Sequence, residues 1–338
     1  MIGKPYGRIL FGDEGRIRDA WQAFEKIPVD QEMCPASPAP WSQNQTTLGK
    51  SVSVTGPGTF RGSAEREISF EPSRQPGWWL DRADLEDSLP FRVSVENVWN
   101  TMRNIVLHCG SPHNYMRMAE HIIALRTGLG LDNVLVRLRS GDPPLFDRGS
   151  LDLVEAVDKA GIVTLEAPAA YLCVREPVTA GGANGGFLTF LPPEDGARRL
   201  DVDCALDFPT AIGQQRIRFT AGPETFRYGA VARTNTTLLN MLFAKTVGKV
   251  FADVRNLGYT RRNILVAGSW GYLNEPRLFH NGKSLEAAWH RATLDLLAAI
   301  ALIDRGRLVG RVVSFKAGHA LDVRLILQLY RRGLLRPA

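Results

Sequence analysis

Six histidines occur in this 338-residue sequence, and histidine is the side chain best suited to bind a metal or to transfer a proton near neutral pH. His121 directly follows Glu120, and His290 lies in a long apolar segment. His319 lies within the segment KAGHALD (316–322). A single histidine on a helix is more often a packed or surface residue than a ligand. These positions therefore suggest catalytic or metal-binding chemistry without assigning it.

The four cysteines do not suggest a metal site or a disulfide framework. They are far apart in the sequence and form no Cys-x-x-Cys pair of the kind that zinc knuckles and redox motifs use. Disulfide-stapled domains are also shorter and richer in cysteine. We therefore expect free thiols at Cys34, Cys109, Cys173 and Cys204.

Helices must position these histidines, because each of the three stands in a segment with helical signals. Ser111, Pro112 and Gly128 predict a helix over 112–127, since serine caps a helix start, proline suits the first turn and glycine ends it. The apolar segment 285–303 predicts the clearest helix of the chain. Further helices are expected over 16–26, 151–160, 238–257 and 319–332.

Strands are expected between these helices, clustered into hairpins. They cover 49–55, 65–70, 131–138, 187–191, 263–268 and 308–315. Single helices between clusters of strands favour an α+β fold over a regular alternation of strand and helix. The glycine-rich segment 55–62 joins two strands, so it does not open a helix as a dinucleotide-binding loop does.

The length predicts two domains, since a domain typically holds about 100 to 200 residues. Prolines interrupt a Ser- and Ala-rich stretch near 35–40, which is typical of a linker. We therefore expect an N-terminal extension and linker over 1–45, and we expect deletion of residues 1–42 to leave a folded core. The first α+β domain is expected over 46–165 and the second over 166–338.

The composition excludes several classes of protein. Hydrophobic residues make up 44% and charged residues 22%, which are ordinary values for a folded globular chain. The net charge of +6 is spread along the chain, so it suits an anionic ligand and not nucleic acid, which needs a concentrated basic stripe. The longest apolar run, 296–303, is too short to cross a membrane. Asp13 and Glu14 lie where a secretory signal would be apolar, so we expect a cytoplasmic protein, and we expect it to be a monomer.

Seven segments of the chain carry a resemblance to a known family. In order they are TGPGTFRG (55–62), AEHIIALRTGLGLDN (119–133), PPLFDRGS (143–150), AIGQQRIRFTAGPETFRYGAVART (211–234), YLNEPRLF (272–279), EAAWHR (286–291) and FKAGHALD (315–322). Their order and approximate spacing resemble the UDP-3-O-acyl-N-acetylglucosamine deacetylase family (LpxC-like), the zinc amidases of lipid A biosynthesis. The resemblance implies two similar α+β domains, each a small sheet covered by helices, with the helical layers packed against each other.

The resemblance also implies an active site that binds Zn²⁺ between the two domains. In this family, an adjacent glutamate and histidine on a helix are the general base and a zinc ligand, and here they are Glu120 and His121. The second ligand matches His290 through EAAWHR. Physical chemistry agrees, because three protein ligands leave one zinc position for water and lower the pKa of that water to about 7. A nearby carboxylate can then take the proton of the water.

Three further side chains match catalytic residues of the family. His319 matches the histidine that stabilises the oxyanion or protonates the leaving amine, and Lys316 matches the nearby cation. Thr234 matches the threonine that hydrogen-bonds the same oxygen. A protonated imidazole beside a tetrahedral intermediate can perform both tasks that the resemblance implies for His319.

The third zinc ligand departs from the family pattern. The family has an aspartate four residues after the second ligand, but this chain has Leu294 there, and the aspartate is Asp295. A regular helix would turn Asp295 away from His290 by about 140°. If zinc is bound, a one-residue π-type distortion must bring Asp295 round to the metal. Glu286 shares the face of His290, but it matches a glutamate that is not a ligand in the family.

Other departures concern the acid histidine and substrate recognition. An Ala-Ala pair at 298–299 replaces a Gly-Asp pair whose carboxylate supports that histidine, so we expect a lowered pKa for His319. At two substrate-contact positions, Phe60 stands where the family has a histidine and Asn235 where it has an aromatic residue. Arg291 replaces a lysine, and it is expected either to contact the diphosphate of the substrate or to be solvated.

Two functions follow from these observations. The first is a zinc-dependent deacetylase that acts on UDP-3-O-acyl-N-acetylglucosamine or a related acylated amino-sugar nucleotide. The alternative is a catalytically impaired homologue that binds a sugar nucleotide or lipid precursor as a regulatory protein. The retained polar residues favour the enzyme, since burying them in a cleft that has no use for them is costly. The departures from the family pattern motivate the alternative.

Overall fold

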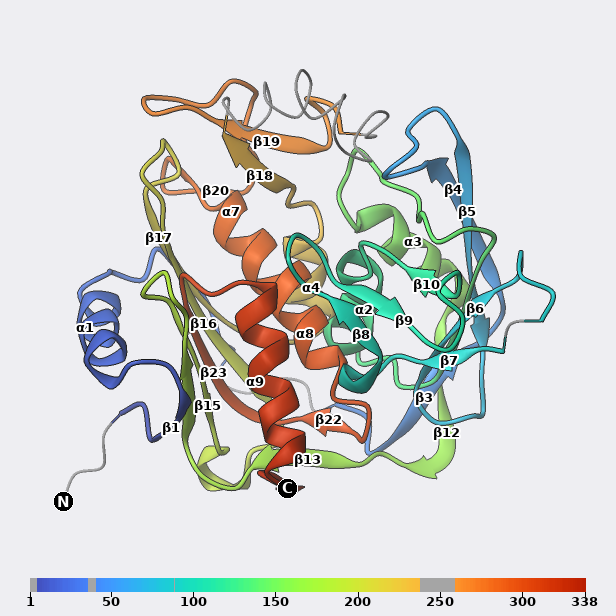
Figure 1. Ribbon diagram of the computed structural model, residues 1–338, viewed down its shortest axis with the longest axis horizontal. Helices are drawn as coiled ribbons and strands as arrows, with labels where there is room; N and C mark the ends of the chain where they lie inside the picture. The colour runs from blue at the N-terminus through green and yellow to red at the C-terminus, as the bar shows by residue number, and fades with distance from the viewer. Residues whose placement is uncertain (1–4, 36–40, 88, 238–258) are drawn as a thin grey trace.

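The protein consists of two main β-sheets with helices between them (Figure 1). Figure 1 shows a computed structural model, which describes residues 5–35, 41–87, 89–237 and 259–338. Within these residues, the larger sheet has seven strands and the smaller main sheet has five. The expected α+β fold, with sheets outside and helical layers inside, is confirmed.

The larger sheet combines the N-terminal segment with the second half of the chain. In spatial order its strands are β1 (Arg8–Phe11), β14 (Val178–Gly181), β15 (Phe187–Leu191), β23 (Gly310–Phe315), β16 (Leu200–Asp207), β17 (Gln214–Thr220) and β2 (Gln31–Met33). Strand β15 has the sequence FLTFL, and its first four residues are all buried. A strand covered on both faces is apolar along its length, so this sheet must be covered on its outer face as well.

The smaller sheet lies on the other side of the helices. Its spatial order is β4 (Val52–Pro57), β5 (Glu65–Pro72), β11 (Val134–Leu138), β6 (Trp78–Arg82) and β7 (Phe91–Arg92). Residues of β11 alternate between buried and half-buried. This alternation indicates that one face packs on the helices and that the other face is more open to solvent.

The helices fill the space between the sheets. They are α2 (Glu120–Leu129), α3 (Leu151–Ala160), α4 (Pro223–Gly229), α7 (Glu286–Trp289), the π-helical segment η3 (His290–Leu296), α8 (Leu297–Ala301) and α9 (His319–Arg331). The continuous helix α7–η3–α8 is buried on nearly every side, and α8 packs directly against α2. Across the described residues, every helix is too short or too polar to span a membrane.

Short strands and turns surround this core. They are β3 (Asn44–Leu48), β8 (Val98–Asn100), β9 (Val106–His108), β10 (Tyr115–Met116), β12 (Ile162–Pro168), β13 (Tyr171–Val174), β18 (Thr234–Thr237), β19 (Ile264–Ala267), β20 (Phe279–His280), β21 (Lys283–Ser284), β22 (Arg307–Leu308), β24 (Leu335–Pro337) and the 3-10 turns η1 (Val95–Asn97) and η2 (Glu194–Gly196). Strand β3 pairs with β12, and β18 pairs in parallel with β19.

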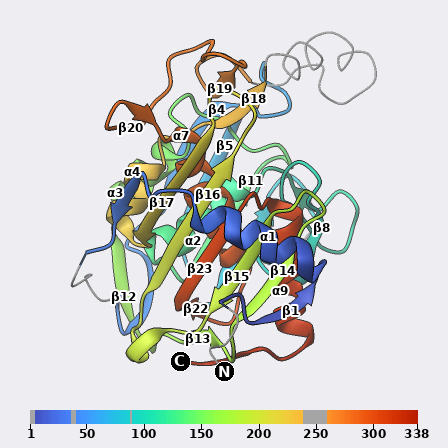
Figure 2. The ribbon, with the colours of Figure 1, turned by 90° about the vertical axis from the view of Figure 1, so that its left-hand side faces the viewer.

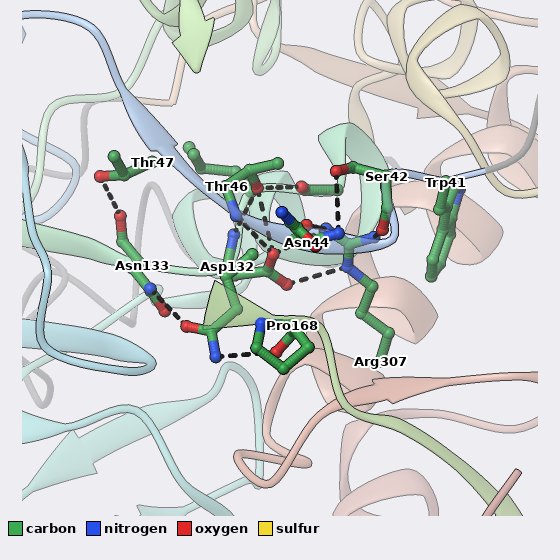
Figure 3. A network of polar contacts seen from close by, with 12 residues as sticks. Trp41, Ser42, Asn44, Thr46, Thr47, Asp132, Asn133, Pro168 and Arg307 are labelled. Atoms are coloured by element: carbon green, nitrogen blue, oxygen red, sulfur yellow. Dashed lines mark hydrogen bonds and ion pairs between the residues drawn. The ribbon is translucent and has the colours of Figure 1, made fainter. Parts of the chain in front are cut away.

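A polar network joins the two halves of the molecule at one end of the central helices (Figure 3). The Asp132 carboxylate accepts hydrogen bonds from the Arg307 guanidinium at 2.6 and 2.9 Å and from the Thr46 backbone N–H at 2.8 Å. Arg307 also donates to the Ser42 carbonyl at 2.6 Å. Because Asp132 follows α2 and Arg307 follows α8, this bidentate pair fixes the ends of the two helices relative to each other.

The N-terminal segment is part of the larger sheet. Strands β1 and β2 pair with β14 and β17, so the segment supplies both edge strands. Helix α1 (Glu14–Glu25) lies across the outer face of the sheet (Figure 2). Its Trp21 and Phe24 contact Phe187 of β15 at ring-centroid distances of 4.9 and 5.7 Å. The expectation of a separate extension over 1–45 is therefore wrong for these elements, because the amphipathic helix covers an apolar sheet face.

Most elements that the sequence predicts within the described residues are present, with one clear difference in range, whereas the long strands β16 and β17 were not predicted. Helix α3 covers the expected range 151–160. The helix expected over 112–127 begins only at Glu120, because the residues before it form turns and strand β10. Met118 has a φ of 50°, a left-handed backbone conformation that interrupts a right-handed helix. The helix expected over 238–257 lies outside the described residues.

Candidate active site

Three helical segments bring candidate residues together at the centre of the molecule. Helix α2 supplies Glu120 and His121 from its first turn, and η3 supplies His290 and Asp295. Helix α9 begins with His319. The three segments lie near one another between the sheets (Figure 1). Side chains that are up to 199 positions apart in the sequence therefore share one small region.

Glu120 is held inside the protein by a backbone hydrogen bond. The side chain is 2% exposed, and its Oε2 accepts the Ile105 N–H at 2.9 Å. Its other oxygen, Oε1, lies 3.9 Å from Nε2 of His319. Burial raises the pKa of Glu120 above its ordinary value. A fixed carboxylate with a raised pKa is a suitable proton acceptor near neutral pH.

His121 presents a neutral imidazole to the same region. Burial, together with the nearby His290, lowers the pKa of His121 to about 3. The ring centroids of the two histidines are 5.3 Å apart. Among the described residues, the buried Nε2 of His121 has no hydrogen-bond partner. A neutral imidazole nitrogen with a free lone pair can serve as a metal ligand.

The helix that carries His290 adopts a π-helical turn over η3. The expected π-type distortion between His290 and Asp295 is therefore confirmed. Nδ1 of His290 lies 3.6 Å from Oδ1 of Asp295, although five residues separate them. In a regular α-helix the two side chains would point in different directions. The π-turn therefore brings both side chains to the same side of the helix.

His319 lies between two carboxylates. Its Nε2 is 3.6 Å from Oδ1 of Asp295 and 3.9 Å from Oε1 of Glu120. Burial alone would lower the pKa of His319, but the carboxylates of Asp295 and Glu120 raise it above the ordinary value. The expectation of a lowered pKa is therefore wrong. The alanines at 298–299 replace the carboxylate that supports this histidine in the family pattern. The carboxylates of Asp295 and Glu120 lie close to His319 instead.

Thr234 and Lys316 lie at different distances from this cluster. Thr234 is the first residue of β18, and its Oγ1 is 2.9 Å from Nε2 of His290, within hydrogen-bond distance. Lys316 precedes α9, and its Nζ lies 3.4 Å from the Asp207 carboxylate. Thr234 thus contacts a candidate ligand, whereas the contact of Lys316 is an ion pair near the surface.

Arg291 is placed differently from both expectations. Its side chain is neither solvated nor free to reach a diphosphate, because it is 5% exposed. Its guanidinium donates to Oδ1 of Asp322 at 2.7 Å and to the Ala317 carbonyl at 3.0 Å. Arg291 is therefore an interior residue that joins η3 to α9.

Sequence reasoning did not single out Asp322, the partner of Arg291. This carboxylate is fully buried on α9, and burial raises its pKa. It also acts on His319, whose pKa it raises. The sequence feature that could have identified Asp322 is its position three residues after His319. On a helix this spacing places the two side chains next to each other on one face.

The remaining candidates lie in three different environments. Phe60 contacts the Arg117 guanidinium, whose central carbon is 4.0 Å from the ring centroid. Asn235 follows Thr234 in β18 and is half-buried. Glu286 is fully buried, and its carboxylate accepts hydrogen bonds from the Arg233 guanidinium at 2.6 and 2.9 Å. This ion pair engages both oxygens of Glu286, which supports its exclusion as a substitute metal ligand.

The donor set fits a zinc ion in chemical type. Two imidazoles and one carboxylate are typical of catalytic zinc sites that keep one position open. Within the described residues, no three His, Cys, Asp or Glu side chains converge closely enough to hold a metal as they stand. In that same part of the chain, His121 Nε2 and Asp295 Oδ1 are buried without a hydrogen-bond partner. A buried polar atom without a partner lowers the stability of the folded protein. A cation bound by both atoms would give them a partner, so these residues fit a metal.

Comparison with known proteins identifies the family. The model of the family described as UDP-3-O-acyl N-acetylglycosamine deacetylase, LpxC, matches residues 45–331. Curated proteins from Brucella ovis, Brucella canis and Brucella suis, each named UDP-3-O-acyl-N-acetylglucosamine deacetylase, are 28% identical to this chain over 287 residues. The match covers 82% of this chain and 92% of each relative. This chain therefore belongs to the UDP-3-O-acyl N-acetylglycosamine deacetylase family and is an enzyme of the amidase and deacetylase class.

Proposed function

We propose that this protein is a zinc-dependent deacetylase acting on UDP-3-O-acyl-N-acetylglucosamine or a related acylated amino-sugar nucleotide. The reaction hydrolyses the acetamide and releases acetate and a free amine, as in lipid A biosynthesis. The observation that carries the proposal is the buried cluster of two imidazoles and two carboxylates beside His319. The names of the relatives support the choice of substrate.

In this proposal, His121, His290 and Asp295 hold the zinc ion. When bound, zinc acts as a Lewis acid for the amide carbonyl and lowers the pKa of the attacking water. The unpaired Nε2 of His121 and Oδ1 of Asp295 support their assignment as ligands. The neutral form of His121 also supports it, because a protonated imidazole cannot bind a metal.

Glu120 is the general base of the proposed mechanism. It takes a proton from water at its carboxylate while the backbone N–H of Ile105 fixes its orientation. His319 then gives a proton to the leaving amine, and its raised pKa keeps it charged at higher pH than an ordinary histidine. Thr234, which lies beside His290, stabilises the oxygen of the tetrahedral intermediate, and Lys316 does so by leaving its ion pair with Asp207.

Two of the three substrate contacts expected from the sequence are compatible with the structure. Phe60 and Asn235 remain candidate contacts, and their types imply that sugar or acyl recognition differs from that of the family. Arg291 does not have this role, because its buried guanidinium donates to Asp322. We place the reaction in the cytoplasm and expect a monomer without a nucleic-acid partner, as the sequence indicates.

A binding or regulatory protein is the second candidate function. The observation that favours it is the lack, within the described residues, of three donor side chains already arranged around a metal. Such a protein would bind the acylated sugar nucleotide and leave the acetamide intact. The two functions differ in one measurable product, which is acetate.

Incubation of the purified protein with zinc and UDP-3-O-acyl-N-acetylglucosamine tests the proposal. We expect one acetate released for each deacetylated sugar nucleotide, loss of the activity after chelation and recovery on adding zinc. The His121→Ala variant is the matched control, since it removes a proposed ligand and keeps Glu120. Tight binding of the intact substrate without acetate release would favour the regulatory protein.

A further inference from the structure

We propose that Thr293 is the positioning residue that holds the π-turn of η3 and thereby keeps Asp295 at the metal site. Its hydroxyl bonds the backbone of the preceding turn, and its side chain fits against Gly229 of α4. This inference rests on the proposed function in one respect, the role of Asp295 as a ligand. Thr293 is fully buried and bonds its own helix, so the role assigned to it is to set the register of that helix.

The site needs a specific register because of the spacing between the two ligands of η3. An α-helix turns about 100° per residue, so a residue five positions after His290 would point about 140° away from it. The observed separation of 3.6 Å between His290 Nδ1 and Asp295 Oδ1 requires the wider π-turn. Isolated π-turns are rare, so neighbouring contacts must stabilise this one.

The Thr293 hydroxyl supplies such a contact inside the helix. Oγ1 of Thr293 donates to the carbonyl of Trp289 at 2.6 Å. In an α-helix this carbonyl would receive the backbone N–H of residue 293, whereas a π-helix moves the backbone bond one residue later. The side-chain hydroxyl therefore takes the place of a backbone donor at the point where α7 passes into η3. Insertion of a side-chain donor into the helix ladder is a known cause of helix distortion.

A second helix leaves room for this threonine. Thr293 is fully buried, and it lies directly against Gly229 at the end of α4. A Cβ atom added to Gly229 would lie 2.5 Å from Cγ2 and 2.6 Å from Oγ1 of Thr293. These distances are far below van der Waals contact, so only glycine fits there without movement of Thr293. The hydroxyl is thus held from outside as well as from within the helix.

The acceptor of this bond is also fixed. Trp289 is fully buried, and its indole Nε1 donates to Oε1 of Gln31 at 2.9 Å. Its ring contacts Phe219 and Tyr228 at centroid distances of 5.1 and 4.9 Å. Because the ring cannot shift freely, the Trp289 carbonyl is a stationary acceptor. Loss of the Thr293 donor should therefore act on the turn that follows, which carries Asp295.

Metal titration of three full-length proteins tests the inference. Wild type, Thr293→Val and Thr293→Ser are freed of metal and titrated with Zn²⁺ by calorimetry, and Co²⁺ absorption reports the number of ligands. Valine fills the same volume without the donor, and serine keeps the donor. We expect Thr293→Val to weaken metal affinity by about 10- to 100-fold, as residues that orient ligands do, and to change the Co²⁺ spectrum. Thr293→Ser should stay within about threefold of wild type, on the same scale.

Equal metal affinity and equal Co²⁺ spectra in wild type and Thr293→Val would overturn the inference and leave the proposed function intact. Absence of metal binding by wild type would instead overturn the proposed function. Gly229→Ala provides an independent variant on another helix, and we expect it to weaken metal binding in the same direction as Thr293→Val. Circular dichroism checks that each variant is folded.

Deletion of Thr293 gives a separate test that does not depend on the stability of the valine variant. The deletion places Asp295 four residues after His290 and removes the need for a π-turn. We expect this shortened protein to bind Zn²⁺ within about tenfold of wild type, a smaller loss than a displaced ligand would cause. A folded deletion variant without metal binding would contradict the inference.

Discussion

The two central helices present their candidate ligands in different ways. Helix α2 carries Glu120 and His121 side by side in a regular first turn. The neighbouring helix α7–η3–α8 carries His290 and Asp295 in a π-turn, with a spacing that a regular helix cannot use. One helix places its two residues by the spacing of a regular helix, and the Ile105 N–H outside it orients the Glu120 carboxylate. The other depends on contacts with the segments around it.

These outside contacts come from three parts of the chain. Gln31 of the N-terminal segment bonds Trp289, which directly precedes His290. Asp322 of α9 bonds Arg291, and Gly229 of α4 accommodates Thr293. The π-turn, in which the spacing differs by one residue, is therefore the part of this helix that neighbouring elements contact most directly.

Removal of residues 1–35 should reduce the stability of the protein more than any other change. It should also free Trp289 of the helix α7–η3–α8, because Gln31 is its hydrogen-bond partner. Burial of a large apolar side chain stabilises a protein by about 1.5–3 kcal/mol, and this segment buries Ile17, Trp21, Phe24 and Ile27. We expect the shortened chain to lose cooperative urea unfolding of the larger sheet. An unchanged midpoint would show that the segment is a dispensable extension, as the sequence alone predicts.

Glu120→Gln should have the next largest effect and should leave both helices intact. The amide keeps the size of the side chain but cannot accept a proton, so turnover should fall by about 10²- to 10⁴-fold. Zinc content and the unfolding midpoint should stay near wild type. Glu155→Gln on α3 is the matched control, because this carboxylate is exposed and far from the candidate ligands in sequence. Near-normal turnover of Glu120→Gln would remove Glu120 from the role of base.

Asp322→Ala should destabilise the protein because it removes the ion pair that joins η3 to α9. It leaves the Arg291 guanidinium buried without its charged partner, which typically costs about 3–5 kcal/mol in the free energy of unfolding. Asp158→Ala is the control, since its pair with Arg227 is about two-fifths exposed and should contribute about 0–1 kcal/mol. Equal losses in the two variants, measured by urea denaturation, would contradict the role given to the buried pair.

The sequence predicted the unusual feature of the site because that feature is local. The number of residues between His290 and Asp295 fixes their relative direction in a helix, and the resemblance supplied the demand that both face one metal. The range of α3 was predicted for a similar reason, as Gly161, which ends the helix, directly follows it in the sequence. Local geometry can thus be predicted from the sequence when the residues that determine it are close together in the chain.

The errors concern contacts between distant segments. Pro112 suggested a helix start, but pairing of β10 with β9 and the backbone of Met118 delay it to Glu120. Arg291 was expected to face solvent or substrate, whereas its partner Asp322 is 31 residues away in the chain. The helical pattern of the N-terminal segment was recognised, but its sequence alone does not indicate that the helix packs on β15 of the larger sheet.

Zinc binding by wild type and Asp295→Ala tests the central claim most directly, which is that the π-turn completes a three-ligand metal site. Both proteins are purified without added metal, analysed for bound elements and then titrated with Zn²⁺. We predict about one zinc ion per wild-type chain and much weaker binding by Asp295→Ala, since a catalytic site loses one of three protein ligands. A wild-type protein that contains no zinc and takes up none on titration would contradict the account.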